Sequence, residues 1–262
     1  MTRIFKLWVG SLLLVALFAL ISVASFDKPV AILVHDLFGT RHFGRLAHSP
    51  GQSIPLISSV IFVICGFAAL LGRRFSRLET AVLLCTISLV VTEVIKNQLK
   101  FVFGRTWPDS WAPGILSLIH DNQFGFHFFH PGVSFGSFPS GHAAAVAAVM
   151  SALWILFPKL RAGCGICVAA ADVGLVFLNL HFISDVVVGT FLGVSVGLFT
   201  VALWTATGRP DSLGVPSPNS DPISLQYKLV GNVGALCRAR QSGTDGSLIS
   251  VREPQPRPER SR

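Results

Sequence analysis

The sequence predicts an all-α polytopic membrane protein in which six transmembrane helices form a bundle. The 262 residues are 51% hydrophobic and 13% charged, with a mean hydropathy of +0.63, which lies beyond the range of ordinary soluble domains. Long apolar segments recur up to residue 204, each close to the roughly 20 residues that cross a bilayer as a helix. Basic residues gather in alternate short links between these segments, as the positive-inside rule predicts.

Six segments are long and apolar enough, or nearly so, to be spans. They are residues 7 to 26, 53 to 72, 78 to 96, 142 to 158, 164 to 181 and 185 to 204. The first has a short basic region before it, as a signal peptide has, but the length of its apolar run favours a retained helix. In the last, Gly189, Gly193 and Gly197 repeat every four residues, which predicts a bare helix side for close packing by a neighbour.

The orientation of the spans follows from the basic residues near their ends. Those at the expected cytoplasmic ends are Arg3, Lys6, Arg73, Arg74, Arg77, Lys159 and Arg161. They predict that both termini are cytoplasmic and that the long loop 101 to 141 is external. Lys28, Arg41 and Arg45 in the first external loop act against this orientation. We expect a bacterial inner-membrane protein whose external face meets the periplasm.

The chain divides into a membrane domain, residues 1 to 204, and a tail, residues 205 to 262. The tail is rich in Pro, Ser and Arg and has too few apolar residues to bury a core, so we expect a disordered, basic, cytoplasmic extension. The net charge of +8 suits contact with anionic headgroups or phosphorylated substrates, although the same residues also set topology. The expected partners are the bilayer and a phosphorylated lipid, with no nucleic acid; the oligomeric state stays open.

The sequence predicts no metal site, no cofactor and no disulfide framework. The five cysteines are odd in number, and at least three lie in apolar segments. His120, His127 and His130 alternate with phenylalanines in the external loop, a pattern more typical of an aromatic lid or membrane-interface belt than of metal ligands.

Several charged residues at membrane depth have separate interpretations. Glu93 and Lys96 are one turn apart, which predicts a structural ion pair. Asp172 lies inside the fifth expected span, where an unpaired acid is costly, and the sequence identifies no partner for it.

Three polar clusters lie at the ends of expected spans. KFVFGRTWP, residues 100 to 108, follows the third span; PSGH, residues 139 to 142, begins the fourth; and HFISD, residues 181 to 185, separates the fifth from the sixth. Because the predicted topology puts all three at the same membrane face, we expect them to converge there.

The second cluster has the features of an anion site. Ser140 is placed to cap the helix that follows, and Gly141 allows an anion to approach the free amide groups at its positive end. We call Ser140, Gly141 and these amides the anion cradle. Lys100 and Arg105 add positive charge, and the guanidinium of Arg105 suits phosphate oxygens.

The two histidines supply the groups that phosphoryl transfer requires. His142, beside the cradle, can give a proton to a departing alkoxide. His181 can act as nucleophile, with Asp185 accepting a hydrogen bond from its other ring nitrogen. A histidine at a helix end is usually structural, so the prediction depends on the combination. The combination indicates metal-free phosphoryl transfer through a phosphohistidine.

Lys100, the PSGH sequence at 139 to 142 and the pair His181 and Asp185 resemble the three signatures of the type 2 phosphatidic acid phosphatase superfamily. This superfamily also includes bacterial acid phosphatases and vanadium haloperoxidases, and the resemblance covers about residues 50 to 205. It implies six membrane helices, an external site and removal of phosphate from lipids. It also implies that His181 is the nucleophile, Asp185 orients it and His142 is the general acid, while Lys100, Ser140 and Gly141 hold the phosphate.

The sequence departs from these signatures at two arginines that normally grip phosphate oxygens. Trp107 stands where the first signature has its arginine, and Leu175 where the third has its own. Arg105 is the expected substitute for the first of them. Two alternatives stay open: a lipid-to-lipid phosphotransferase, and a catalytically impaired membrane protein that binds anionic lipid. A transporter lacks support, because no inverted repeat is evident.

Overall fold

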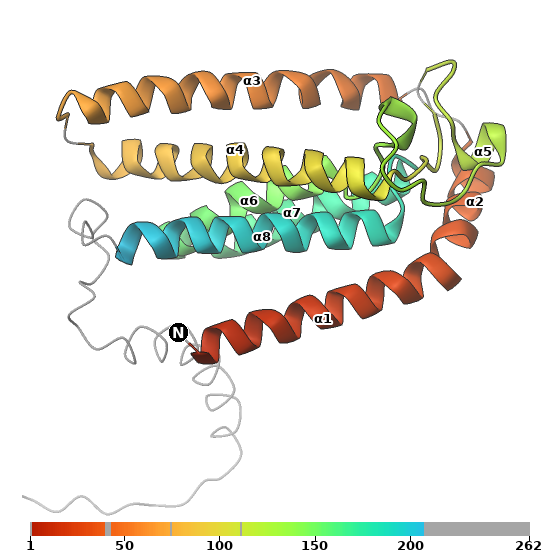
Figure 1. Cartoon of the computed structure of the whole chain (residues 1–262), viewed down its shortest axis with the longest axis horizontal. Helices are drawn as coiled ribbons and strands as arrows, with labels where there is room; N and C mark the ends of the chain where they lie inside the picture. The colour runs from red at the N-terminus through yellow and green to blue at the C-terminus, as the bar shows by residue number, and fades with distance from the viewer. Residues whose placement is uncertain (1, 40–42, 74, 111, 207–262) are drawn as a thin grey trace, which may run out of the picture. The chain divides into compact units, whose positions relative to one another are not determined.

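The computed structural model describes residues 2 to 39, 43 to 73, 75 to 110 and 112 to 206 (Figure 1). Within these ranges the regular structure is helical and contains no strand, which confirms the all-α prediction. The tail predicted for residues 205 to 262 lies, beyond Ala206, outside the described residues.

Each of the six expected spans corresponds to a helix. In chain order the helices are α1 Thr2–Ser25, α2 Asp27–Phe38, α3 Phe43–Leu70, α4 Arg77–Phe103, α5 Leu118–Asp121, α6 Gly141–Leu156, α7 Arg161–Phe177 and α8 Ile183–Ala206, with short 3-10 turns η1 Val133–Phe135 and η2 Pro158–Leu160. The helix α2 was not predicted. The third span was predicted to end at residue 96, but α4 continues to Phe103, because no helix breaker occurs before Gly104. Lys100 therefore lies within the last turn of α4.

Four helical segments are long and apolar enough to cross a membrane. They are Phe5–Ser25, Arg77–Phe103, Pro158–Phe177 and Ile183–Ala206. The helix α6 and the apolar part of α3, Leu56–Ala68, are shorter. The chain is thus an integral membrane protein with four candidate spans among its described residues, and the number six stays a prediction.

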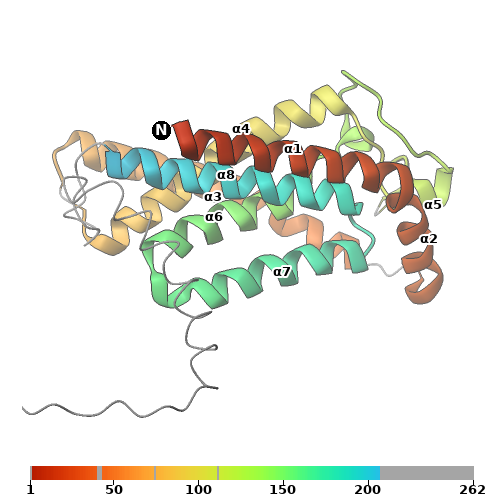
Figure 2. The ribbon, with the colours of Figure 1, turned by 90° about the horizontal axis from the view of Figure 1, so that it is seen from below.

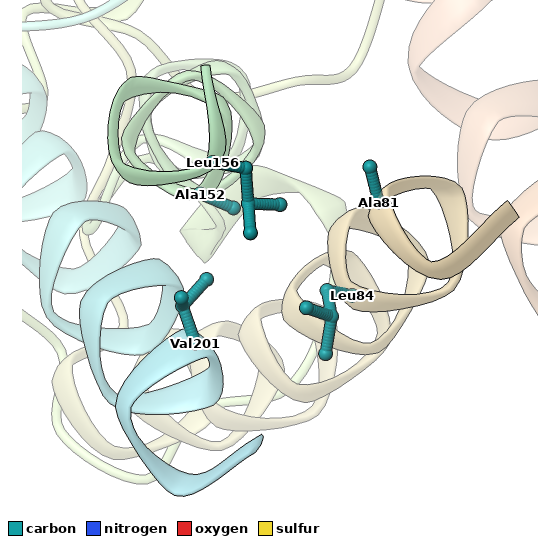
Figure 3. Packing of buried hydrophobic residues seen from close by; sticks show 5 residues of the cluster. All are labelled: Ala81, Leu84, Ala152, Leu156 and Val201. Atoms are coloured by element: carbon teal, nitrogen blue, oxygen red, sulfur yellow. The ribbon is translucent and has the colours of Figure 1, made fainter. Parts of the chain in front are cut away.

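The core of the bundle lies where α4, α6 and α8 pack against one another. Ala81, Leu84, Ala152, Leu156 and Val201, from these three helices, form one buried apolar cluster (Figure 3). The other long helices cover this core: α1 packs along α8, α3 along α4, and α7 against α6 and α8 (Figures 1 and 2).

The glycines of α8 allow its close approach to α6. A Cβ atom on Gly189 would meet the carbonyl oxygen of Ser140, and one on Gly193 would meet the backbone of Ala144. This confirms the predicted packing side of α8. The two helices begin at the same end of the bundle, where the amide of Ser140 donates to the carbonyl oxygen of Asp185 at 2.9 Å. The second and third polar clusters are thereby held together.

The two ends of the bundle differ in chemistry. The links from α3 to α4 and from α6 to α7 lie at one end, and the loop from α4 to α6 lies at the other (Figure 1). Described basic residues of the first end include Arg77 and Lys159, whereas the three polar clusters meet at the second.

Candidate active site

The loop from Gly104 to Ser140 is fixed to the end of α4 by backbone hydrogen bonds. Gly104 adopts a left-handed conformation with φ 54°, and a Cβ atom there would collide with the carbonyl oxygen of His127. The amide of His127 donates to the carbonyl oxygen of Gly104 at 2.7 Å, and that of Ser137 donates to the carbonyl oxygen of Arg105 at 3.0 Å. These contacts hold the loop in a defined position at the end of α4.

The start of α6 has the Ser140 cap that the sequence predicts. Ser140 is the N-cap of α6, and its Oγ accepts a hydrogen bond from the amide of Ala143 at 3.4 Å. Gly141 is the first residue of the helix. The first amides of an α-helix have no acceptor within the helix, and its dipole is positive there, so this end suits an anion.

The two predicted catalytic histidines lie next to each other at the cradle end of the bundle. Their ring centroids are 6.3 Å apart, with His142 in the first turn of α6 and His181 in the link between α7 and α8. His181 is only 3% exposed, and its Nδ1 lies 3.7 Å from Oδ2 of Asp185. Burial lowers the pKa of His181, Asp185 opposes this shift and the charge of Lys100 adds to it; the pKa lies below its usual value, so the imidazole is neutral at neutral pH. Because Nδ1 is turned toward Asp185, Nε2 is the ring nitrogen of His181 whose lone pair could serve as a nucleophile.

The carboxylate of Asp185 is held from several directions. It lies fully buried in the first turn of α8. Its Oδ1 accepts a hydrogen bond from Arg105 Nη1, and its Oδ2 accepts one from the hydroxyl of Ser137 and one from the amide of Phe182 at 3.1 Å. These bonds fix the carboxylate beside His181.

The structure places Arg105 beneath the site and not at the surface of the cradle. Its side chain has no exposed area, Nη1 also donates to Ser184 Oγ at 2.6 Å, and Nη2 donates to Asp27 Oδ2 at 2.8 Å. Both terminal nitrogens thus already bind carboxylates. The geometry makes Arg105 a partner of Asp27 and Asp185, and the phosphate contact that the sequence predicts for it stays a prediction.

Three phenylalanines, two from the loop and one from the link between α7 and α8, surround the guanidinium of Arg105, which the sequence did not indicate. The guanidinium carbon of Arg105 lies 4.2 Å from the ring centroid of Phe182, 4.8 Å from that of Phe126 and 5.5 Å from that of Phe124. These rings exclude water from the buried charges and contribute cation–π attraction. Phe128 and Phe129 remain exposed, so only part of the predicted aromatic surface faces outward.

Asp27 was missed by sequence reasoning. It begins α2, is buried, and accepts hydrogen bonds from Ser22 Oγ at 2.7 Å and from the amide of Ser184 at 3.1 Å. With Arg105 and Asp185 it forms what we call the buried carboxylate network. The available signal was an acidic residue directly after the first span, at the same end of the bundle as the three polar clusters.

The positions of the two missing arginines are filled by apolar side chains with different neighbours. The Trp107 ring lies 5.1 Å from the ring of His181, and its Nε1 donates to the carbonyl oxygen of Val133 at 2.7 Å. Leu175 is buried against Ala143 and Val186. Neither position supplies charge to the cradle.

Lys100 lies at the edge of a pocket next to Trp107. Its Nζ is 5.5 Å from the centroid of the Trp107 ring. Both residues line a pocket of about 460 Å³, which the loop residues His130, Val133 and Phe135 also line. A pocket with a charged and aromatic lining therefore adjoins Trp107, whose ring lies next to that of His181.

The charged residues that the sequence places at membrane depth have partners in the structure. Glu93 and Lys96 form the predicted ion pair at 2.6 Å. Both oxygens of Asp172 lie 2.9 Å from the hydroxyl of Thr190, which is the partner that the sequence did not identify. Across the described ranges no three His, Cys, Asp or Glu side chains gather where they could hold a metal ion.

Comparison with known proteins agrees with the motifs. The family model described as PAP2 superfamily matches residues 80 to 209. The crystal structure of the first transmembrane PAP2 type phosphatidylglycerolphosphate phosphatase from Bacillus subtilis is 19% identical, with a TM-score of 0.41; the match covers 75% of this chain and 97% of that chain. No curated protein sequence matches. The family match spans all three polar clusters, and the chain belongs to the PAP2 superfamily.

Proposed function

We propose that this protein is a membrane lipid phosphatase that removes phosphate from a lipid phosphate or diphosphate through a phosphohistidine, without a metal ion. One observation carries the proposal. The ring centroids of His142 and His181 lie 6.3 Å apart at the positive end of α6, and Oδ2 of Asp185 lies 3.7 Å from Nδ1 of His181. Membership of the PAP2 superfamily supports the same chemistry.

The proposed reaction has two steps at one phosphorus atom. His181 Nε2 attacks phosphorus, the bond to the lipid oxygen breaks, and His142 gives that oxygen a proton. Water then attacks the phosphohistidine, His142 takes a proton from it, and the bond between nitrogen and phosphorus breaks to release phosphate. Lys100, Ser140, Gly141 and the amides of α6 hold the phosphate oxygens.

The buried carboxylate network supports the charge changes of this reaction. Arg105 binds both Asp27 and Asp185, and Asp185 Oδ2 also lies 3.7 Å from Nδ1 of His181. When His181 attacks phosphorus its imidazole becomes positive, and the neighbouring carboxylate of Asp185 stabilises that charge.

The chemistry is tested by trapping the phosphoenzyme. Purified protein with a radiolabelled lipid phosphate should yield an acid-labile, alkali-stable protein label, as phosphohistidine does, and orthovanadate should prevent it. Turnover should be the same with and without EDTA. Activity that EDTA abolishes and a divalent ion restores would contradict the proposal.

We propose that the site faces the periplasm of a bacterial inner membrane and that both termini are cytoplasmic. The described basic residues Arg77 and Lys159 lie at the end of the bundle opposite the site. Cysteines introduced singly at positions 120 and 159 of a cysteine-free variant are expected to differ. A membrane-impermeant maleimide applied to the periplasmic side should label position 120 and not position 159. Labelling of position 159 and not of position 120 would contradict the proposed orientation.

A further inference from the structure

We infer that Lys96 is a phosphate-binding residue of this site and, with Lys100, supplies the positive charge that the missing arginines would provide. The inference rests on the proposed function, because it assigns a further ligand to the same anion cradle.

The first observation is the position of the Lys96 side chain. A Cβ atom built on Gly141 would lie 2.9 Å from Cδ of Lys96 and 3.1 Å from its Nζ. The ammonium therefore lies against the first residue of α6, where the helix amides face the cradle. Gly141 makes room for this lysine as well as for an anion.

The second observation is electrostatic. The Lys96 side chain is 12% exposed and lies at the positive end of α6, where a cation is unfavourable and an anion favourable. The ion pair with Glu93 at 2.6 Å offsets part of this cost and keeps the side chain in place. The ion pair alone does not explain why the ammonium lies against Gly141. A purely structural pair could equally well form on the exposed side of α4. A phosphate between Lys96 and the amides of α6 would turn this unfavourable placement into a favourable one.

The third observation is the distribution of charge around the cradle. Arg105 is engaged by Asp27 and Asp185, and Trp107 and Leu175 occupy the two arginine positions. Lys96 and Lys100 are one turn apart on α4, and both reach toward the loop or the start of α6. A phosphate monoester carries up to two negative charges near neutral pH; Lys100 supplies one positive charge, and Lys96, whose ammonium is shared with Glu93, adds hydrogen-bond donors and part of a second charge.

The test uses the full-length protein in detergent and the probe orthovanadate, whose equilibrium binding is measured by calorimetry without turnover. Lys96→Met is expected to weaken vanadate binding by about tenfold or more and to lower kcat/KM on a lipid phosphate by about 10²-fold. Lys96→Arg should retain part of both. The matched control, Lys159→Met, removes a lysine from the opposite end of the bundle and should change neither.

A second test leaves Lys96 unchanged and moves its side chain by a substitution at Gly141, with a substitution at Gly163 as the control. Gly141→Ala puts a methyl group against Cδ of Lys96 and should weaken vanadate binding, whereas Gly163→Ala in α7, with open space around it, should not. In the Lys96→Met background the effect of Gly141→Ala should shrink, because the two changes act on one contact. Unchanged elution on size exclusion shows that each variant is folded.

The outcomes separate the two proposals. If Lys96→Met binds vanadate as tightly as the wild type, the role of Lys96 is wrong while the phosphatase can stand. If the wild type binds vanadate through Lys96 but forms no phosphoenzyme with any lipid phosphate, the cradle is right and the proposed function is wrong. If the wild type binds neither vanadate nor phosphate, both are wrong.

Discussion

His181→Ala is expected to abolish phosphoenzyme formation and to lower kcat/KM by roughly 10⁴-fold or more, because no other group replaces an attacking nitrogen. His142→Ala should cost about 10² to 10⁴-fold, as loss of a general acid does, and should still yield some trapped phosphoenzyme. The measurement is kcat/KM on a lipid phosphate together with the yield of label. His120→Ala is the control, since that histidine pairs with Asp109 in the loop and is half exposed.

The pH dependence provides an independent check on His181. Because burial lowers its pKa, the neutral nucleophile should persist at pH values where an ordinary histidine is already protonated. We therefore expect the acid limb of kcat/KM to lie below pH ~6.5. An acid limb at or above that value, after correction for the second ionisation of the phosphate substrate, would contradict a neutral His181 as the nucleophile, as would full activity of His181→Ala.

Arg105→Ala is expected to destabilise the protein by about 3 to 5 kcal/mol, because it leaves Asp27 and Asp185 buried without their cation. It should also lower kcat, since Asp185 loses one of the contacts that hold it beside His181. Arg105→Lys should be costly as well, because one ammonium cannot reproduce two separate guanidinium nitrogens that bind two carboxylates. Thermal unfolding in detergent and steady-state kinetics measure the two effects.

The comparison between kcat and vanadate affinity decides how Arg105 acts. If it acts through Asp185, the variants should lower kcat and leave vanadate affinity within about twofold. Adding Asp27→Asn to Arg105→Met should recover part of the lost stability, because one buried charge is removed. If Arg105→Ala unfolds like the wild type and loses vanadate affinity instead, then Arg105 contacts the anion, as the sequence alone suggests.

The sequence predicts the class of the protein and the residues that gather at the candidate site, because both depend on local patterns. Apolar length predicts helices, and the described helices match all six expected segments. The Ser140 cap and the glycine side of α8 also follow from spacing, and the structure confirms both. His142, His181 and Asp185 are found by their motifs, and the alternation of helix directions brings them to one end of the bundle.

The roles of Arg105, Asp27, Trp107 and Lys96 depend on contacts between segments that are distant in the chain. Arg105 binds Asp27 and Asp185, which are 78 and 80 residues away from it, and no local spacing relates them. The sequence shows Lys96 beside Glu93 on one helix, but the start of α6 that Lys96 also meets comes from another. A side chain takes as partners whichever groups the packed helices place within its reach. Hydropathy and spacing therefore determined that this protein lies in a membrane and which motif residues gather at one end of the bundle. Tertiary packing alone decided that Arg105 pairs with Asp27 and Asp185 and that Lys96 lies at the start of α6.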